Sequence, residues 1–574
     1  MYNDTKLERD DIMYKIPYGI SNYKTLKEEE YYYVDKTMYL EKLEDIGRVL
    51  VYLRPGRFGK TLFTSMMNYY YDVNSKDLFN TLFKNTYVYD NPTKNKNNYY
   101  ILKFDFSGMT TALKKIEDLE IEFKNKLVDG FDKFNNSYKT NFEADSKKSP
   151  NGMLLEFLSY FRSLNLDNKL YIIIDEYDNF TNAILEGQGD RFSSIVGNEG
   201  FLKGFYAVIK EYCSNSIVDR VFITGICPIT LDSMTTGFNI STDLSRDIRF
   251  NSMIGLTHDE VKYLIKDINK DTQENIFSLM LNNYDGYLFN KKEKDRVFNA
   301  TLVMYFLKNY YDFNEIPEQL LDNNIAFNYG KVENLLKLQN NNFYKEVIDI
   351  ILKTGTIEGE LKSKFNLSIN FEKDDIISLL YYFGYLTIKE PSVGNNVIFS
   401  IPNYVMNELY TNYFLKILRD INIGIESSII GDSLREIIYE GKIDKITKYV
   451  SNILKLSDNR IFMKFDEKYI QLLYFSLLIG NKEFFIYNEY PTNNGYVDLI
   501  LLGNKEYCKY NIMIELKYLK LKEYRRNRKL LNIKREEAIN QLNSYSMDER
   551  IDNTNLKKYI AIFIGHDLKL LESI

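Results

Sequence analysis

The sequence predicts an α/β fold divided among several domains, and three observations support this prediction. The chain has 574 residues, 45% of them hydrophobic and 15% aromatic, which is enough to form several buried cores. Short apolar runs alternate with helical stretches between residues 14 and 255, a pattern typical of a parallel sheet covered by helices. The same alternation returns near the C-terminus, between residues 495 and 565.

The apolar runs and the helical patterns between them give the expected order of elements. Four runs form the predicted N-terminal sheet, at 48–53, 99–107, 169–178 and 219–227, with a charged helical segment at 108–168. Residues 255–335 are predicted to be helical, because Thr257 and Glu260 form a helix-start pattern. Two helices and then a hairpin between 343 and 405 indicate a winged-helix module, an order that many small α+β domains share. Strands at 495–503, 510–519 and 558–565 and a helix at 534–546 complete the prediction.

Composition excludes several classes of function. The net charge of −6 shows no global nucleic-acid signature, so any basic surface must be local. Three widely spaced cysteines form neither a disulfide framework nor a zinc site, and two histidines argue against His-rich metal centres. The polar N-terminus and the lack of an 18-residue apolar run predict a soluble, cytoplasmic chain that does not enter a membrane.

A candidate phosphate-binding loop follows the first apolar run. It reads Arg54, Pro55, Gly56, Arg57, Phe58, Gly59, Lys60, Thr61 and leads into a predicted helix. In such a loop, backbone N–H groups and the lysine bind phosphates, while the neighbouring hydroxyl binds Mg²⁺. Arg54 occupies the position where the common pattern has a glycine. From these residues alone, an ordinary strand–turn–helix is an equal alternative.

Acidic residues end the third run, and a threonine lies near the end of the fourth. Asp175 and Glu176 follow four apolar residues, and Thr224 lies in the run 219–227. Asp175 is predicted to bind Mg²⁺ with Thr61, Glu176 to polarise the attacking water, and Thr224 to sense the γ-phosphate. The alternative is a buried strand that ends at a charged turn. The combination with the phosphate loop favours the nucleotide site.

A second group of charged residues lies in the C-terminal segment. Adjacent strands bring Asp498 and Glu515 together, and alternation puts Glu515 and Lys517 on one face. Two carboxylates can bind one or two Mg²⁺ ions, and a lysine can stabilise charge on a scissile phosphate. Glu489 is predicted to complete the metal ligands, with Glu467 as the other candidate. Gln541, on the following helix, is predicted to orient the site.

A basic run follows this group. Nine Lys and Arg residues lie between 517 and 535, and they could contact nucleic-acid phosphates without reading sequence. The alternative is a solvated helix face, which is the usual role of a charge run. The adjacent carboxylates favour the nucleic-acid interpretation.

These motifs resemble the AAA-ATPase-like family whose members carry a C-terminal PD-(D/E)xK nuclease-like domain. The resemblance rests on "IPYGISNYKTLKEEEYYYVDKTMYL", "RPGRFGKTL", "IIIDEYD" and "GICPITLDSMTTGFNISTDLS". In that family the loop typically reads R-P-R-R-F-G-K-S-L, so Arg54 fits the resemblance. Gly495-Tyr496 departs from the Gly-Arg that usually precedes the aspartate.

The residues and the resemblance together predict four domains. A P-loop NTPase parallel sheet with helices is expected at 14–255, a helical lid at 256–335, a winged-helix-like module at 336–420, and a restriction-endonuclease-like α/β domain at 421–574. The resemblance implies ATP and Mg²⁺ as cofactors, nucleic acid (DNA foremost) as partner, and assembly into homo-oligomers as an option.

The expected function is ATP binding and hydrolysis coupled to Mg²⁺-dependent cleavage of nucleic acid. One alternative is an NTP-dependent switch or scaffold whose nuclease-like domain binds nucleic acid or a protein without cutting. A third is a regulator that reads DNA through the winged helix.

Overall fold

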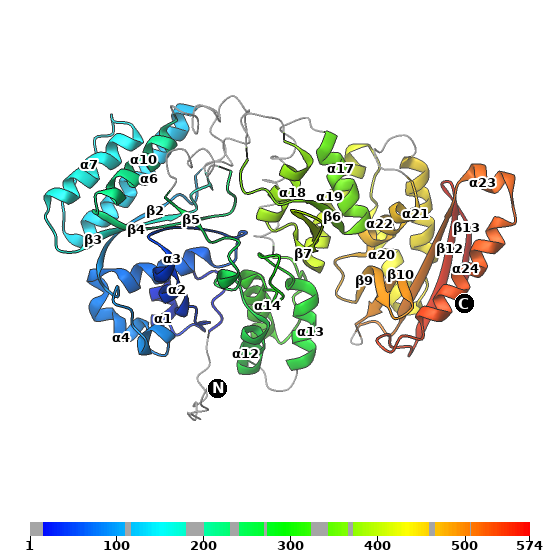
Figure 1. The fold of residues 1–574 in the computed structure, drawn as a ribbon. Coiled ribbons are helices and arrows are strands. Elements are labelled where there is room, and N and C mark those ends of the chain that lie inside the picture. Colours follow the sequence, from blue (N-terminus) through cyan, green and yellow to red (C-terminus); the bar gives the residue numbers. More distant parts are fainter. Residues whose placement is uncertain are drawn as a thin grey trace. The chain divides into compact units, whose positions relative to one another are not determined.

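The computed structural model describes residues 15–109, 116–179, 200–229, 240–268, 273–322, 342–365, 371–457, 465–504 and 507–574. The chain divides into two compact units (Figure 1). The first comprises residues up to 315 together with 323–344 and 358–402, and the second comprises 316–322, 345–357 and 403–574. The four predicted domain boundaries stay predictions.

A five-stranded sheet forms the centre of the first unit, and its paired strands are parallel. Its order is β2-β3-β4-β1-β5, so β4 lies between β1 and β3. The strands are β1 (Val49–Leu53), β2 (Tyr99–Asp105), β3 (Lys169–Asp175), β4 (Val218–Gly225) and β5 (Thr242–Asp243). The parallel sheet predicted from the four apolar runs is therefore confirmed. Because the strands are parallel, the residues that follow β1, β3 and β4 meet at one edge of the sheet.

Helices surround this sheet. They are α1 (Tyr23–Glu28), α2 (Met38–Ile46), α3 (Lys60–Tyr71), α4 (Phe79–Leu82), α5 (Tyr87–Asp90), α6 (Ile116–Tyr138), α7 (Pro150–Ser163) and α10 (Phe201–Ser214), with 3₁₀ turns η1 (Val73–Leu78) and η2 (Ile248–Phe250). Strand β1 is buried along its whole length, as the continuous apolar run predicts. The predicted helical segment 108–168 contains α6 and α7.

The rest of the first unit contains three helices and a small sheet. The helices are α12 (His258–Ile268), α13 (Gln273–Tyr284) and α14 (Ala300–Phe313). The sheet has the order β6-β8-β7, from β6 (Thr356–Glu360), β7 (Thr387–Pro391) and β8 (Asn396–Ser400). Helix α18 (Lys373–Tyr382) also belongs to this unit, whereas α17 (Asn342–Thr354) belongs to the second unit from Lys345 on; the two helices flank β6 in sequence. The expected order of two helices and a hairpin is present, with the short strand β6 added between the helices.

The second unit is built on a mixed sheet of order β13-β12-β11-β10-β9. Its strands are β9 (Phe484–Thr492), β10 (Gly495–Gly503), β11 (Asn511–Leu519), β12 (Leu556–Ile564) and β13 (Asp567–Ser573). Its helical segments are α19 (Tyr404–Asp420), α20 (Ser427–Arg435), η3 (Glu436–Glu440), α21 (Asp444–Ser457), α22 (Glu467–Leu478), α23 (Leu521–Arg526) and α24 (Leu530–Tyr545). Strands β10 and β11 are antiparallel and β11 and β12 are parallel, so the predicted C-terminal α/β domain is confirmed as a mixed sheet with helices.

Candidate functional site

The candidate phosphate loop connects β1 to α3 and contains two left-handed residues. Gly59 caps α3 at φ 104°, and Arg57 has φ 67°. The Lys60 side chain is buried, and its ammonium donates to the carbonyls of Arg54 (2.9 Å) and Pro55 (2.8 Å). The lysine is therefore held by the loop's own backbone. Burial lowers the pKa of Lys60, with Glu176 acting in the opposite direction.

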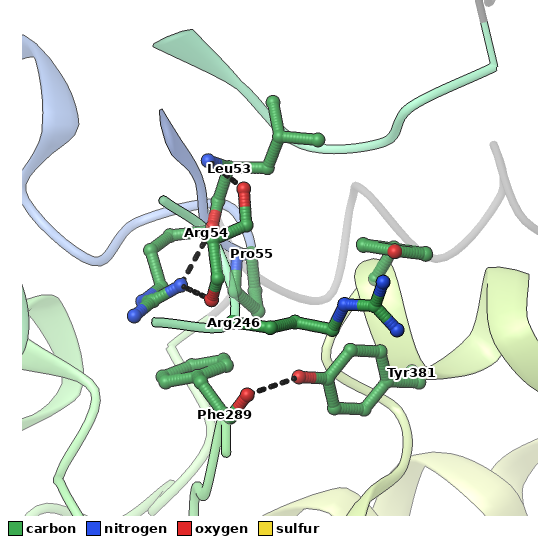
Figure 2. Close-up of a pocket in the computed structure, with 8 residues that line it drawn as sticks. Leu53, Arg54, Pro55, Arg246, Phe289 and Tyr381 are labelled. Atoms are coloured by element: carbon green, nitrogen blue, oxygen red, sulfur yellow. Dashed lines mark hydrogen bonds between the residues drawn. The ribbon is translucent and has the colours of Figure 1, made fainter. Parts of the chain in front are cut away.

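Arg54 is a buried structural residue in this arrangement (Figure 2). Its guanidinium donates to the carbonyls of Leu53 (2.8 Å), Ser245 (2.7 Å) and Phe250 (3.0 Å). It also lies over the rings of Tyr52 (4.2 Å) and Phe289 (3.9 Å to the centroid). Its charged group thus joins β1 to the segments around 245–251 and 289, while its carbonyl accepts from Lys60.

The rest of the loop is fixed by residues from the helical segment. Phe58 packs edge-on against the rings of Tyr287 (4.9 Å) and Phe289 (5.6 Å). The Thr301 backbone N–H donates to the Arg57 carbonyl (3.2 Å), and so does the Thr301 hydroxyl (2.6 Å). The Arg57 side chain is exposed. Asp35, which precedes this loop in the chain, accepts from the backbone N–H groups of Thr37 and Tyr87.

Asp175 lies at the end of β3, directly beside helix α3. Its Oδ2 accepts from the Thr64 hydroxyl (2.9 Å) and lies 3.6 Å from the Lys103 ammonium. Its Oδ1 is buried and has no hydrogen-bond partner within the described part of the chain. Thr61, in the first turn of α3, is half-buried. Thr64 and Lys103 were not expected from the sequence, although both lie next to predicted elements.

Glu176 and Thr224 occupy different environments. Glu176 is half-buried, with φ 52°, and burial raises its pKa against the opposing effect of Lys60. Thr224 is fully buried, and its hydroxyl donates to the Tyr52 carbonyl (2.8 Å). Thr224 therefore links β4 to β1 in this structure, while Glu176 lies within the electrostatic reach of the phosphate-loop lysine.

The second candidate site lies where β10 and β11 separate. These strands pair from Leu501–Ile512 to Leu499–Ile514. Asp498 and Glu515 are the next residues beyond the Leu499–Ile514 pair. The Asp498 carboxylate accepts from the Leu516 backbone N–H (2.7 Å) and from the Gln471 side chain of α22 (2.6 Å). The hairpin therefore brings Asp498 and Glu515 together, as the sequence predicts.

Lys517 and Glu515 form a buried ion pair in this site. The Lys517 ammonium donates to Glu515 Oε1 (2.7 Å), whereas Glu515 Oε2 is buried without a hydrogen-bond partner among the described residues. Burial raises the pKa of Glu515 to about 8, and the charge of Asp498 adds to this effect while Lys517 opposes it. Burial alone lowers the pKa of Lys517, but the charges of Glu515, Asp498 and Glu467 together raise it.

The two further acidic candidates are placed differently. Burial raises the pKa of Glu467, and the charge of Asp498 raises it further, so Glu467 shares the electrostatic environment of this site. Glu489, on β9, forms an ion pair with Lys468 and has φ 50°. Glu489 and Glu467 both stay predictions as the additional acidic residue; Glu467 interacts electrostatically with Asp498 directly, and Glu489 pairs with a lysine that does so. Gln471, one turn after Glu467 on α22, was not expected.

Gln541 and the basic run lie on or near α24. The Gln541 amide donates to the Tyr545 hydroxyl (3.2 Å), and the Tyr545 ring lies against Gly495. Arg535 pairs with Glu572. Lys522, Arg525, Arg526, Arg528 and Lys529 are exposed, which leaves a group of positive charges accessible at residues 522–529.

The donor atoms fit a hard cation in both places, because each holds a buried carboxylate oxygen without a partner and Mg²⁺ prefers oxygen ligands. Asp175 with Thr61, and Asp498 with Glu515, could hold such an ion. Among the described residues, no three or more His, Cys, Asp or Glu side chains are grouped so that they could hold a metal. An ion in either place would therefore take its other ligands from water or substrate.

Comparison with known proteins supports two domain resemblances. Residues 17–235 match the family model described as predicted AAA-ATPase, and residues 465–572 match the PD-(D/E)XK nuclease superfamily. Both resemblances predicted from the motifs are confirmed. The first match contains the phosphate loop, Asp175 and Glu176, and the second contains Asp498, Glu515 and Lys517.

One curated relative and one solved structure are also similar. The chain is 25% identical over 248 residues to an uncharacterized protein in the vnfD 5′ region of Azotobacter chroococcum; the match covers 43% of this chain and 44% of that protein. The matched region thus spans less than half of that relative's length. The Walker-type ATPase of Pyrococcus abyssi matches with a TM-score of 0.36 and 12% identity, covering 65% of this chain and 94% of that one.

None of the helices within the described ranges combines the length and apolar character needed to cross a membrane.

Proposed function

We propose that the chain binds and hydrolyses ATP in its first unit and cleaves nucleic acid, DNA foremost, at a Mg²⁺-dependent site in its second. One observation carries both halves of the proposal. Among the described residues, Asp175 Oδ1 and Glu515 Oε2 are buried carboxylate oxygens without hydrogen-bond partners, as are those of Glu156 and Asp349, and Asp175 and Glu515 are the ones that lie at the two candidate sites. A buried carboxylate oxygen without a hydrogen-bond partner is costly, and a bound cation would relieve that cost.

In the first unit, Lys60 would leave the carbonyls of Arg54 and Pro55 to bind the terminal phosphates. Thr61 and Asp175 would hold Mg²⁺, and Glu176 would orient the attacking water. Bound Mg²⁺ would supply neutralisation of the phosphate charge. Arg54 supports the loop from within the protein, since its two terminal guanidinium nitrogens donate to backbone carbonyls.

In the second unit, Asp498 and Glu515 would hold the metal, and Lys517 would stabilise the charge that develops on the scissile phosphate. Glu467 joins this acidic group, and Gln541 stays the candidate that orients substrate. The exposed charges at 522–529 would contact the nucleic-acid backbone. The same contacts would serve the alternative function, a switch that binds nucleic acid without cutting, and the exposed Tyr496 favours it because that position offers no positive charge.

Nucleotide turnover with and without DNA, measured beside Mg²⁺-dependent cleavage on the same samples, tests the proposal. Lys60→Ala should abolish nucleotide turnover, with the exposed Lys24→Ala as control. Lys517→Ala should abolish cleavage and leave turnover intact, with Lys569→Ala, on β13, as control. Turnover without cleavage of any DNA or RNA in Mg²⁺ or Mn²⁺ would establish the non-cleaving switch instead.

A further inference from the structure

We propose that Asp178 is a positioning residue for nucleotide hydrolysis, because it joins the ends of β3 and β4 and thereby fixes Glu176. The inference rests on the proposed ATPase function. It concerns the last residue of "IIIDEYD", to which the sequence assigned no role. Asp178 is buried, with 6% of its surface exposed, and it lies two residues after Glu176.

The Asp178 carboxylate holds two consecutive backbone N–H groups beyond β4. It accepts from Ile226 N at 3.1 Å (Oδ1) and 3.0 Å (Oδ2), and from Cys227 N at 2.7 Å (Oδ2). The Tyr177 backbone N–H donates to the Thr224 carbonyl (3.0 Å). Residues 177 and 178 are therefore tied to the end of the neighbouring strand by backbone and side chain together. We call this connection the Asp178 clamp.

Gly225 makes the clamp sterically feasible. A Cβ at this position would lie 2.4 Å from Asp178 Oδ1 and 2.5 Å from Tyr177 Cδ1. Any larger residue would displace both side chains. The Gly225 carbonyl also accepts from the Arg54 backbone N–H (3.1 Å), so the strand end held by Asp178 is bonded to the first residue of the phosphate loop.

Glu176 lies between two fixed points and has a strained backbone. On one side, the Asp175 carbonyl accepts from the Phe106 backbone N–H (3.1 Å). On the other side, the clamp fixes Asp178. Between them Glu176 has φ 52°, a left-handed conformation that is strained for a residue with a Cβ. Strain of this kind persists only where the surroundings impose it, so release of the clamp should let Glu176 move away from Lys60.

Asp178→Asn tests the clamp, because an amide keeps the shape but cannot accept with both terminal atoms. Asp35→Asn is the matched control, since Asp35 also holds two backbone N–H groups in the first unit. We expect Asp178→Asn to lower kcat about 10- to 100-fold, as loss of supporting contacts does at other sites, with KM and nucleotide Kd within 3-fold. Asp35→Asn should leave kcat within 3-fold.

A double-mutant cycle separates positioning from a purely structural role. If Asp178 acts through Glu176, adding Asp178→Asn to Glu176→Gln should not lower kcat further. Additive losses, or a kcat for Asp178→Asn within 3-fold of the control, would overturn the inference. Absence of turnover in the wild type would instead contradict the proposed function itself.

Thermal melting is measured first, to show that each variant is folded at the assay temperature. If Asp178→Asn does not fold, Gly225→Ala serves as the second test of the clamp, because its added Cβ displaces the Asp178 carboxylate without removing it. Gly225→Ala should then reproduce the loss of kcat with retained nucleotide binding. If neither variant folds, the clamp is a structural element only and the positioning role is wrong.

Discussion

Arg54 occupies a position of the phosphate-loop motif, but in the structure its side chain contacts the protein itself. The sequence places it in the phosphate loop, where its charge suggests a contact with phosphate. In the structure its guanidinium is 1% exposed, bonded to backbone carbonyls and enclosed by two aromatic rings. A planar cation with several donors suits this position, because it satisfies carbonyls from different segments at once.

Arg54→Lys should therefore lower stability, because a lysine cannot reproduce the planar set of donors. We expect a loss of about 2–4 kcal/mol, the range for breaking buried charged hydrogen bonds. Urea unfolding of the two proteins gives this difference. Unchanged stability combined with lost nucleotide binding would show instead that Arg54 acts on the phosphates directly.

Glu408, on α19, gives a prediction about pH, because burial raises the pKa of its carboxyl. A glutamate whose pKa is raised by folding binds its proton more tightly when folded, so its ionisation lowers stability as pH rises above the unfolded pKa. Glu408→Gln should remove this penalty, about 1.4 kcal/mol for each tenfold difference in proton affinity between the folded and unfolded states. The melting temperature of the variant should exceed that of the wild type at pH 8, and the two should converge near pH 4. A gain of the same size at both pH values would contradict this origin.

At the scale of elements, the turn that follows α18 packs directly on the phosphate loop. Gly384 has φ 83°, and a Cβ there would lie 2.9 Å from the Pro55 Cβ. The Tyr381 hydroxyl donates to the Phe289 carbonyl (3.4 Å), as Figure 2 shows. Thr387 Oγ1 accepts from the Leu288 backbone N–H (2.8 Å). The end of α18 and the turn that follows it are therefore in direct contact with the loop that is proposed to bind nucleotide and with the segment around residue 289.

Gly384→Ala should displace this turn from Pro55 and weaken nucleotide binding. Gly394→Ala is the matched control: Gly394 also has a left-handed φ, 68°, but a Cβ there would meet nothing within 4 Å. Backbone strain is common to both variants, so a difference in nucleotide Kd measures the effect of the Pro55 packing. We expect Gly384→Ala to raise Kd several-fold more than the control. Equal nucleotide Kd values for the two variants would mean that the turn at Gly384 does not influence nucleotide binding by the loop.

Much of this arrangement could be predicted from the sequence. The apolar runs identified four strands of the first sheet, because strands buried on both faces are almost continuously apolar; the edge strand β2 carries a charged residue, Lys103, in its interior. The spacing of Asp498, Glu515 and Lys517 correctly brought the carboxylates together. The prediction of Glu489 as the further ligand could not include its left-handed backbone or its pairing with Lys468, because neither can be read from local spacing. The Asp178 clamp links residues 48 positions apart, which local spacing does not show.

At the scale of the whole molecule, each unit holds a buried lysine beside a buried carboxylate. Lys60 lies near Asp175 and Glu176 in the first unit, and Lys517 pairs with Glu515 in the second. The net charge is −6, so nucleic acid would be drawn to local positive charge rather than to the chain as a whole. The exposed positive charges at 522–529 follow Lys517 closely in sequence.

Replacing Arg525, Arg526 and Arg528 together by alanine should reduce the salt dependence of nucleic-acid binding. The slope of log K against log[salt] should become shallower by roughly 0.9 for each phosphate of duplex DNA that the variant no longer neutralises. A triple variant at Lys24, Lys76 and Lys133, all in the first unit, has the same change in net charge and serves as control. Equal slopes for the two variants would show that residues 522–529 are an ordinary solvated surface.

The position of Lys60 has a further consequence for ligand selection. Its ammonium already has two good acceptors in the loop itself, so an incoming anion must compete with the protein's own backbone for it. A small ion such as inorganic phosphate offers the Lys60 ammonium few acceptors beyond the two carbonyls that it would lose. A nucleoside triphosphate brings several phosphate oxygens and a metal ion at once. If the chain binds ATP as proposed, the loop should release Lys60 for the complete nucleotide and discriminate against the fragments of that nucleotide.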